Sequence, residues 1–220
     1  MRMCRCGSCV EGRCDAGVRF EVKDAGYYYE KNHWVLRHVD LSVESGERVG
    51  LIAPSGYGKS TLSKIIAGYL QPREGSVTLD GTPMPTKGYR PVQMIYQHPE
   101  KAVDPYWTMN RILREGWNPP DDFLTEMGIE QEWLTRHPTE LSGGEMQRFC
   151  IARALGPETK FLLCDEISTM LDTITQAQIW RLILDQAEKR NLGLLVITHN
   201  AYLAERICTR TEDLTQLNRV

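Results

Sequence analysis

The sequence predicts an α/β protein whose core is a parallel β-sheet. Short apolar runs that suit buried strands alternate with helical segments along most of the chain, which is the pattern of strand–helix–strand units. The run at residues 49–53 leads into a glycine-rich turn, and the run at 161–164 leads into two carboxylates. Because α/β sheets bind ligands at the carboxyl ends of their strands, both features predict a site at the same edge.

Alternation of apolar and polar residues, or a dense apolar run, marks each expected strand. The first two strands alternate and are expected to pair, whereas the later ones are mostly apolar and are expected to be buried in the parallel sheet. A turn such as Asp80-Gly81 separates some of them from the next element. The expected strands are residues 18–29, 35–43, 49–53, 77–79, 92–96, 161–164 and 194–198.

Helices are expected between these strands. A helix over residues 59–70 places four apolar side chains on one face, namely Leu62, Ile65, Ile66 and Tyr69. Residues 100–140 are more polar and are interrupted by prolines, which predicts a helical insertion in the sheet domain. Helices are also expected over 143–155, where Gly156-Pro157 ends the helix, and over 175–190.

Composition favours one globular domain with no nucleic-acid partner. A chain of 220 residues is long enough to bury a substantial core, and its net charge of −3 argues against a broadly basic surface. No apolar run has the length that spans a bilayer, and we expect no signal peptide. The sequence therefore predicts a soluble or peripheral protein.

Four of the seven cysteines lie near the start of the chain, namely Cys4, Cys6, Cys9 and Cys14. Thiolates at short spacing can converge on zinc or an iron–sulfur centre, but this spacing matches none of the usual metal patterns. We predict that residues 1–17 are an appended, disordered tail with reduced thiols, and a metal site is the alternative. Cys164 lies inside an apolar run and is expected to be buried.

The glycine-rich turn is a candidate phosphate-binding loop. Its backbone N–H groups are expected to point at phosphates, and the helix that follows adds the positive end of its dipole. Lys59 is expected to reach the β- and γ-phosphates, and Ser60 to ligate Mg²⁺. Ala53 stands where the usual pattern has its first glycine, which is tolerable if its backbone angles are ordinary. The expected nucleotide-binding residues here are Ser55, Gly56, Tyr57, Gly58, Lys59, Ser60 and Thr61.

The carboxylates Asp165 and Glu166 follow the apolar strand at 161–164. Asp165 is expected to hold Mg²⁺ directly or through water, as in other enzymes with this type of loop. Glu166 is placed to orient or deprotonate an attacking water. An acidic pair after a strand is usually a solvated turn, but the loop at 53–61 favours the catalytic interpretation.

Residues 141–145, Leu-Ser-Gly-Gly-Glu, resemble the signature motif of ABC-type ATPases, the nucleotide-binding subunits of ABC transporters. The resemblance covers about residues 18–205. It implies ATP hydrolysis with Mg²⁺, and an ATPase domain at 18–220 with a P-loop NTPase fold. That fold has a parallel-sheet core, an antiparallel β subdomain and a helical subdomain, at about 98–155, that carries the signature. In this family two subunits enclose two nucleotides, and the residues that contact the opposite nucleotide would be Ser142, Gly143, Gly144 and Glu145.

Further family motifs match single residues of this chain. Gln97 resembles the glutamine that senses Mg²⁺ and the attacking water, and His199 resembles the histidine that contacts the γ-phosphate. Asp172 ends a segment, 168–172, that resembles the D-loop and would reach across the dimer. Together with Glu166, Gln97 and His199 form the implied catalytic set, and Ser60, Gln97 and Asp165 the implied Mg²⁺ set.

An aromatic residue stacks on adenine in this family. Tyr29 fits its place, and Tyr27 and Tyr28 are the alternatives, because stacking requires only a ring face. Two further positions depart from the family pattern. Ile167 replaces the proline that often follows the catalytic glutamate, and the strands that usually end the domain are not recognisable after His199.

The stretches 97–107 and 171–178 are similar to the ATPases of oligopeptide and nickel importers. This similarity implies a peripheral protein at the cytoplasmic face of the cell membrane. Its partners would be a second ABC ATPase subunit, alike or different, two membrane permease subunits and, indirectly, an extracytoplasmic binding protein. The cargo would be short peptides, nickel or a metal–metallophore complex, driven by ATP-dependent dimer closure. The alternative is the ATPase subunit of a soluble, non-transport enzyme complex.

Overall fold

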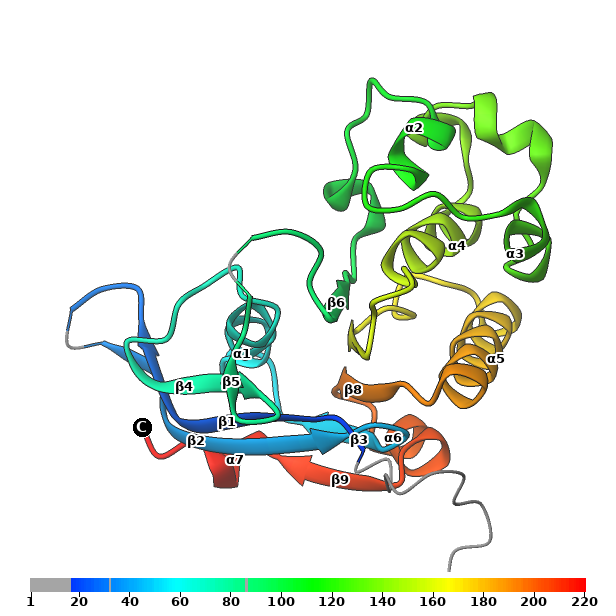
Figure 1. Cartoon of the computed structure of the whole chain (residues 1–220). Helices are drawn as coiled ribbons and strands as arrows, with labels where there is room; N and C mark the ends of the chain where they lie inside the picture. Colours follow the sequence, from blue (N-terminus) through cyan, green and yellow to red (C-terminus); the bar gives the residue numbers. More distant parts are fainter. Residues whose placement is uncertain (1–16, 32, 86) are drawn as a thin grey trace, which may run out of the picture.

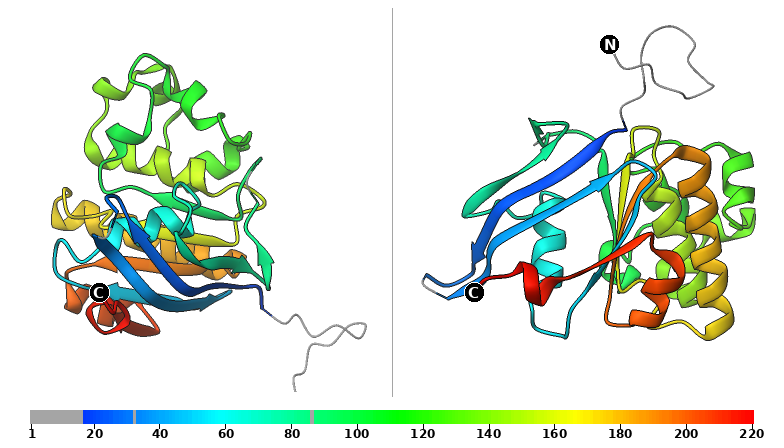
Figure 2. Two further views of the ribbon diagram at one scale, coloured as in Figure 1. Left: turned by 90° about the vertical axis from the view of Figure 1, so that its left-hand side faces the viewer. Right: turned by 90° about the horizontal axis from the view of Figure 1, so that it is seen from below.

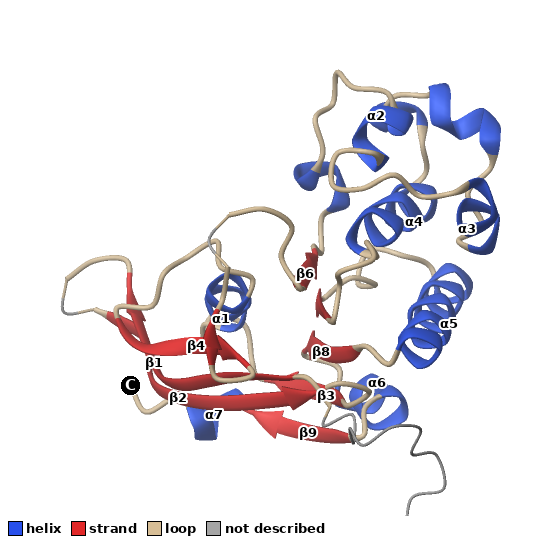
Figure 3. Cartoon of the chain, viewed as in Figure 1, coloured by secondary structure: helices blue, strands red, loops and turns tan. Residues whose placement is uncertain are grey.

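The computed structural model describes residues 17–31, 33–85 and 87–220. Two sheets form its framework (Figure 1; Figure 3). One is antiparallel with strand order β2-β1-β4-β5, and the other is parallel with strand order β6-β7-β8-β3-β9. The predicted fold class is therefore confirmed, including the antiparallel subdomain and the helical segment.

The antiparallel sheet forms because its strands alternate apolar and polar residues. Phe20 on β1 pairs with Val43 on β2 and with Leu79 on β4, and the Phe20 ring meets that of Phe161 at 5.0 Å between centroids. This aromatic contact joins the antiparallel sheet to the parallel one. The strands are β1 (Arg19–Tyr28), β2 (Trp34–Glu44), β4 (Glu74–Leu79) and β5 (Thr82–Pro83).

The parallel sheet is the buried centre of the molecule. Every residue of β7 and β8 is buried, because the antiparallel sheet and helix α1 (Lys59–Ile66) cover one side and helices cover the other (Figure 2). Register pairs Ile52 with Thr198 and Asp165 with Ile197, so β3, β7 and β8 end at the same edge. The strands are β3 (Arg48–Ile52), β6 (Val92–Ile95), β7 (Phe161–Asp165), β8 (Gly193–Thr198) and β9 (Arg210–Asp213).

A helical layer follows β6 and packs on a second core around Phe149 and Ile183. It occupies the side of the parallel sheet away from the antiparallel sheet (Figure 1; Figure 2). None of the helices in the described ranges combines the length and apolar character that crossing a bilayer requires. The α-helices beyond α1 are α2 (Met109–Leu113), α3 (Asp121–Glu126), α4 (Gly143–Ala154), α5 (Thr173–Arg190), α6 (Ala201–Ile207) and α7 (Leu214–Leu217), and the 3₁₀ helices are η1 (Pro99–Ala102), η2 (Gln131–Thr135) and η3 (Pro138–Glu140).

The structure corrects two expectations. The parallel sheet does not end with β8, because β9 adds to it beside β3. This strand is short and polar, with no apolar period, so the sequence did not reveal it. The first helix ends at Ile66, not at residue 70, because Gly68 adopts a left-handed φ of 74°. Tyr69 consequently lies outside the helix, 59% exposed, and does not share its apolar face.

Candidate nucleotide-binding and hydrolysis site

The phosphate-binding loop connects β3 to α1, and two of its glycines have a left-handed backbone. Gly56 has φ 90° and Gly58 φ 88°. A side chain at Gly58 would also come within 2.8 Å of Leu36 Cδ2, so glycine is required there by conformation and by space. The loop borders a pocket of about 330 Å³, lined by Val35, Ser55, Gly56, Gly58, Lys59, Ser60, Thr61, Gln97 and Glu166. This pocket brings six of the seven predicted phosphate-binding residues together with Gln97 and Glu166. The seventh, Tyr57, does not line the pocket and is exposed.

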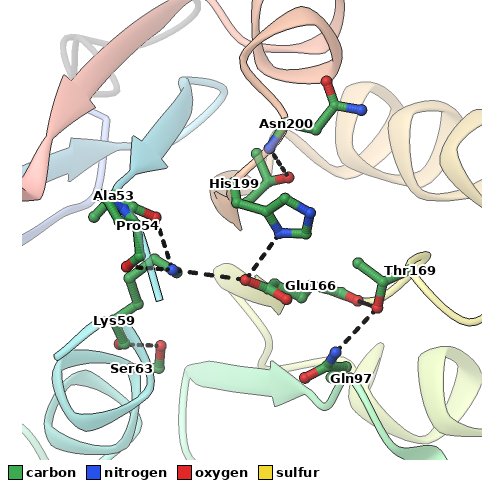
Figure 4. A network of polar contacts seen from close by, with 10 residues as sticks. Ala53, Pro54, Lys59, Ser63, Gln97, Glu166, Thr169, His199 and Asn200 are labelled. Carbon is green, nitrogen blue, oxygen red and sulfur yellow. Dashed lines mark hydrogen bonds and ion pairs between the residues drawn. The ribbon is translucent and has the colours of Figure 1, made fainter. Parts of the chain in front are cut away.

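Lys59 begins α1 and is 93% buried, with 7% of its surface exposed. Its Nζ donates to the carbonyl oxygens of Ala53 at 2.8 Å and Pro54 at 3.0 Å, and lies 3.7 Å from Glu166 Oε1 (Figure 4). Ala53 is buried in the core and is not among the residues with positive φ. Its φ is therefore outside the left-handed region that favours glycine, and alanine fits where the usual pattern has glycine.

Asp165 ends β7 and lies next to the first turn of α1. Burial raises the pKa of its carboxyl group, and a hydrogen bond with Ser60 acts in the opposite direction. Mg²⁺ prefers carboxylate and hydroxyl oxygens together with phosphate oxygens. The Asp165 and Ser60 side chains supply two such ligands side by side, so the residues present fit this ion.

Glu166 has the left-handed φ of 50°, which is uncommon for a residue with a side chain. Its N–H donates to Ile197 O on β8 at 3.0 Å, and its Oε1 lies 3.3 Å from His199 Nδ1. His199 follows β8 and is 57% exposed. The carboxylate therefore stands between Lys59 and His199 at the edge of the sheet (Figure 4).

Gln97 follows β6, the edge strand next to β7. Its Nε2 donates to Thr169 Oγ1 at 3.1 Å, and Thr169 Oγ1 donates to the carbonyl oxygen of Glu166 at 3.0 Å. Thr169 lies inside the segment 168–172 that resembles the D-loop, but among the predicted site residues only Asp172 comes from that segment. Ile167, which replaces the usual proline, is buried at 2% exposure in the helical core.

The three candidate tyrosines have different surroundings. Tyr27 is buried, and Tyr28 packs edge-on against Trp34 at 5.0 Å between ring centroids. Tyr29 is 58% exposed, and its hydroxyl is hydrogen-bonded to that of Thr61, on the first turn of α1, at 3.2 Å. Of the three, Tyr29 has both an exposed ring and a contact with the phosphate-binding loop.

The signature segment begins α4 with a capping box. Glu145 N–H donates to Ser142 Oγ at 3.3 Å, and Ser142 N–H donates to Glu145 Oε2 at 2.7 Å. Gly143 and Gly144 complete this first turn and border a pocket of about 390 Å³. Of the described residues, none lines both this pocket and the one at the phosphate-binding loop. The two sets of predicted nucleotide contacts therefore do not meet within one chain.

Asp172 lines the signature pocket and is the N-cap of α5. Its carboxylate accepts hydrogen bonds from Ile174 N–H at 3.0 Å and Thr175 N–H at 3.1 Å, and from the Thr175 hydroxyl. These bonds lower the pKa of Asp172. The Asp172 side chain thus bonds within its own helix. Its exposure is the one feature that agrees with the predicted contact with a second subunit.

The N-terminal cysteines Cys4, Cys6, Cys9 and Cys14 lie outside the described residues. Within residues 17–31, 33–85 and 87–220, no group of three or more histidines, cysteines or acids could hold a metal ion. Cys164 is fully buried, as predicted.

Comparison with known proteins connects this geometry to a family. The ABC transporter family matches residues 36–169. The nickel import ATP-binding protein NikE of Escherichia coli strain K12 is 33% identical over 215 residues, covering 89% of this chain and 80% of the relative. The NikE protein of E. coli O6:K15:H31 strain 536 is 35% identical over 216 residues, covering 86% and 81%.

Solved structures agree with the sequence relatives. A dimeric, post-hydrolysis structure of the ATP-binding cassette MJ0796 with ADP and Pi superposes with a TM-score of 0.74, at 25% identity, over 88% of this chain and 93% of that one. The cbiO1 protein of Clostridium perfringens shares the fold with a TM-score of 0.73, at 22% identity, over 88% of this chain and 83% of that one. The chain belongs to the ATP-binding subunits of ABC transporters, which hydrolyse ATP to drive transport.

Proposed function

We propose that this chain is the ATPase subunit of an importer for nickel, a metal–metallophore complex or a short peptide. The observation that supports it most is the convergence of Lys59, Asp165, Glu166 and His199 at one edge of the parallel sheet. The NikE proteins are named for nickel import, which favours nickel among the three cargoes.

The side chains of the site suit hydrolysis of ATP. The amide groups of the loop and Lys59 bind the phosphates, and Tyr29 stacks on adenine. Ser60, Asp165 and Gln97 would hold Mg²⁺, which would neutralise charge on the phosphates. Glu166 accepts a proton from the attacking water, and His199, beside the Glu166 carboxylate, orients the γ-phosphate.

A second ATPase subunit completes each nucleotide site. The signature segment at 142–145 and the phosphate-binding loop line different pockets of one chain, so two chains in opposite orientation would enclose two nucleotides. ATP shifts the population toward the closed dimer because its contacts with the opposite signature exist only in that state. The dimeric form of the cassette MJ0796 with ADP and Pi supports this arrangement.

The membrane permeases would dock at a groove of about 780 Å³ next to Gln97. It runs between β6, the helical layer and the loop before β6, and it has both aromatic and charged walls. A short permease helix fits such a groove by burying an apolar face against the tyrosines. The residues that define it best are Tyr69, Tyr96, Lys101, Glu115, Cys150 and Arg153.

In this proposal the chain is a peripheral subunit at the cytoplasmic face of the membrane, bound to two permeases, and a binding protein acts on the opposite side of the membrane. We assign the ATPase domain to residues 18–220 and the helical subdomain to about 98–155. The latter range contains η1 to η3 and α2 to α4, so a groove between it and β6 can transmit motion to the permeases.

The test is transport by the complete complex in vesicles. With permeases, second ATPase subunit and binding protein present, Mg-ATP should drive uptake of radioactive nickel, and Glu166→Gln should abolish uptake while ATP still binds. Uptake of a short peptide but not of nickel would overturn the nickel assignment alone. Undiminished uptake with Glu166→Gln would overturn the role of Glu166.

A further inference from the structure

The turn that carries Glu166 is held by a hydroxyl group that also binds Gln97. Thr169 Oγ1 donates to Glu166 O at 3.0 Å and accepts from Gln97 Nε2 at 3.1 Å. Thr169 N–H also approaches Glu166 O at 3.3 Å. The Thr169 side chain therefore connects Gln97, in the loop after β6, with Glu166, directly after β7 (Figure 4).

The backbone of Glu166 needs such support. A left-handed φ of 50° is costly for a residue with a side chain and persists where surrounding contacts determine it. The N–H group of Glu166 is fixed to Ile197 O on β8, and its carbonyl group is fixed by Thr169 alone among the described residues. Loss of the Thr169 hydroxyl would remove the shorter of the two hydrogen bonds to this carbonyl group and leave only the Thr169 N–H contact at 3.3 Å.

The neighbouring residue anchors the same turn to α5. Ser168 is 3% exposed, and its Oγ accepts hydrogen bonds from Gln176 Nε2 at 2.8 Å and from Trp180 Nε1 at 3.1 Å. Gln176 Nε2 also approaches Ser168 O at 3.3 Å. Because buried polar groups keep their partners, Ser168 is fixed in position, and this fixes the start of the turn at which Thr169 acts.

We propose that Thr169 is a positioning residue for hydrolysis, which acts through Glu166 and Gln97 and does not itself touch the nucleotide. The inference rests on the proposed roles of those two residues. The Thr169 hydroxyl orients both the Glu166 carboxylate and the Gln97 amide. The turn that carries this hydroxyl is anchored by the hydrogen bonds of Ser168 to α5. A small displacement of a catalytic group can lower the rate by about 100-fold, so this hydroxyl affects turnover more than nucleotide binding.

The experiment compares Thr169→Val, which keeps the shape and removes the hydroxyl, with Thr169→Ser, which keeps the hydroxyl. ATPase rates are measured in the assembled complex, and Mg-ATP affinity is measured on the full chain by calorimetry. Thr169→Val should lower kcat at least tenfold and leave KM and ATP affinity within about twofold, and Thr169→Ser should restore most of the rate. Thr82→Val, at an exposed position on β5, is the matched control and should be neutral.

Two results would overturn the inference. One is a kcat for Thr169→Val equal to that of the unaltered protein. The other is an equal loss with Thr169→Ser, which would assign the effect to packing and not to the hydroxyl. If Lys59→Ala leaves the ATP affinity unchanged, that result contradicts the proposed nucleotide site and not the role of Thr169. Failure of the proposed function and failure of this inference are therefore distinguishable. If Thr169→Val fails to fold, Thr169→Ala, which also removes the hydroxyl, should show the same loss in kcat relative to Thr169→Ser.

Discussion

Lys59 and Glu166 face each other at the edge of the parallel sheet, with Nζ 3.7 Å from Oε1. Their side chains are 7% and 15% exposed, and His199 Nδ1 approaches the same carboxylate oxygen at 3.3 Å. A mostly buried pair leaves an uncompensated charge when either partner is removed. The phosphate-binding and hydrolytic parts of the site are consequently coupled, and substitutions in one affect the other.

Replacing Lys59 by alanine should weaken Mg-ATP binding at least tenfold. A hydrogen bond that involves a charged group contributes about 1.5–3 kcal/mol, and 1.4 kcal/mol corresponds to a factor of ten. Calorimetry on the full chain measures this affinity, and Lys160→Ala, at an exposed lysine, is the control. The melting temperature should also fall, and adding Glu166→Gln should recover part of it. Unchanged affinity would refute the assignment of the loop.

Asn in place of Asp165 should stabilise the folded chain at pH 7 while ending hydrolysis. Burial raises the pKa of Asp165, so the folded state favours the neutral acid. This contribution to stability is complete below the unfolded pKa and is lost as the pH rises through the folded pKa. Asp165→Asn is uncharged and avoids that loss. Each kcal/mol by which the free energy of unfolding increases raises the melting temperature by about 2–4 °C.

Thermal melts of Asp165→Asn and the unaltered chain, recorded without nucleotide from pH 3 to pH 8, measure this difference. The gap between the two curves should narrow toward acid pH. With Mg-ATP present the order should reverse, because only the unaltered chain gains stability from tight binding. A variant that melts lower at every pH would show that the Ser60 bond outweighs the cost of burial.

Tyr29→Ala should raise the dissociation constant for ATP about tenfold. Stacking of a base on an aromatic ring is worth about 1–3 kcal/mol, and the Tyr29 ring is exposed beside α1. Tyr29→Phe keeps the ring, removes the bond to Thr61 and should bind nearly normally. Tyr106→Ala, at an 87% exposed ring, is the control. If Tyr29→Ala binds ATP as well as this control does, adenine stacks elsewhere.

Ala53→Gly, which restores the usual pattern of the loop, should lower stability without improving ATP binding. Ala53 has no positive φ and is buried, so glycine gains no conformation that alanine lacks. The more flexible unfolded chain should cost about 0.5–1 kcal/mol. Urea unfolding measures this change, and an accompanying increase in ATP affinity would show that the alanine methyl group constrains the loop.

The sequence by itself determined the parts of this protein that are continuous in the chain. The loop at 53–61, the carboxylates after β7 and the cap of α4 each lie within a few residues, so local backbone geometry alone brings their groups together. Alternating or apolar runs likewise predicted the strands of both sheets, except for the short β5 and β9. In those runs the order of apolar and polar residues directly determines which side chains are buried.

Only the tertiary structure decided which distant residues meet. Gln97 and Thr169 are separated by 72 positions, and they touch because β6 lies beside β7 in the sheet. The choice of Tyr29 over Tyr27 depends on which ring the sheet buries. The addition of β9 depends on backbone hydrogen bonds to β3. Backbone groups are the same for every residue type, so the side chains of β9 do not reveal this pairing. Such contacts follow from the packing of strands and helices, and no local pattern specifies them.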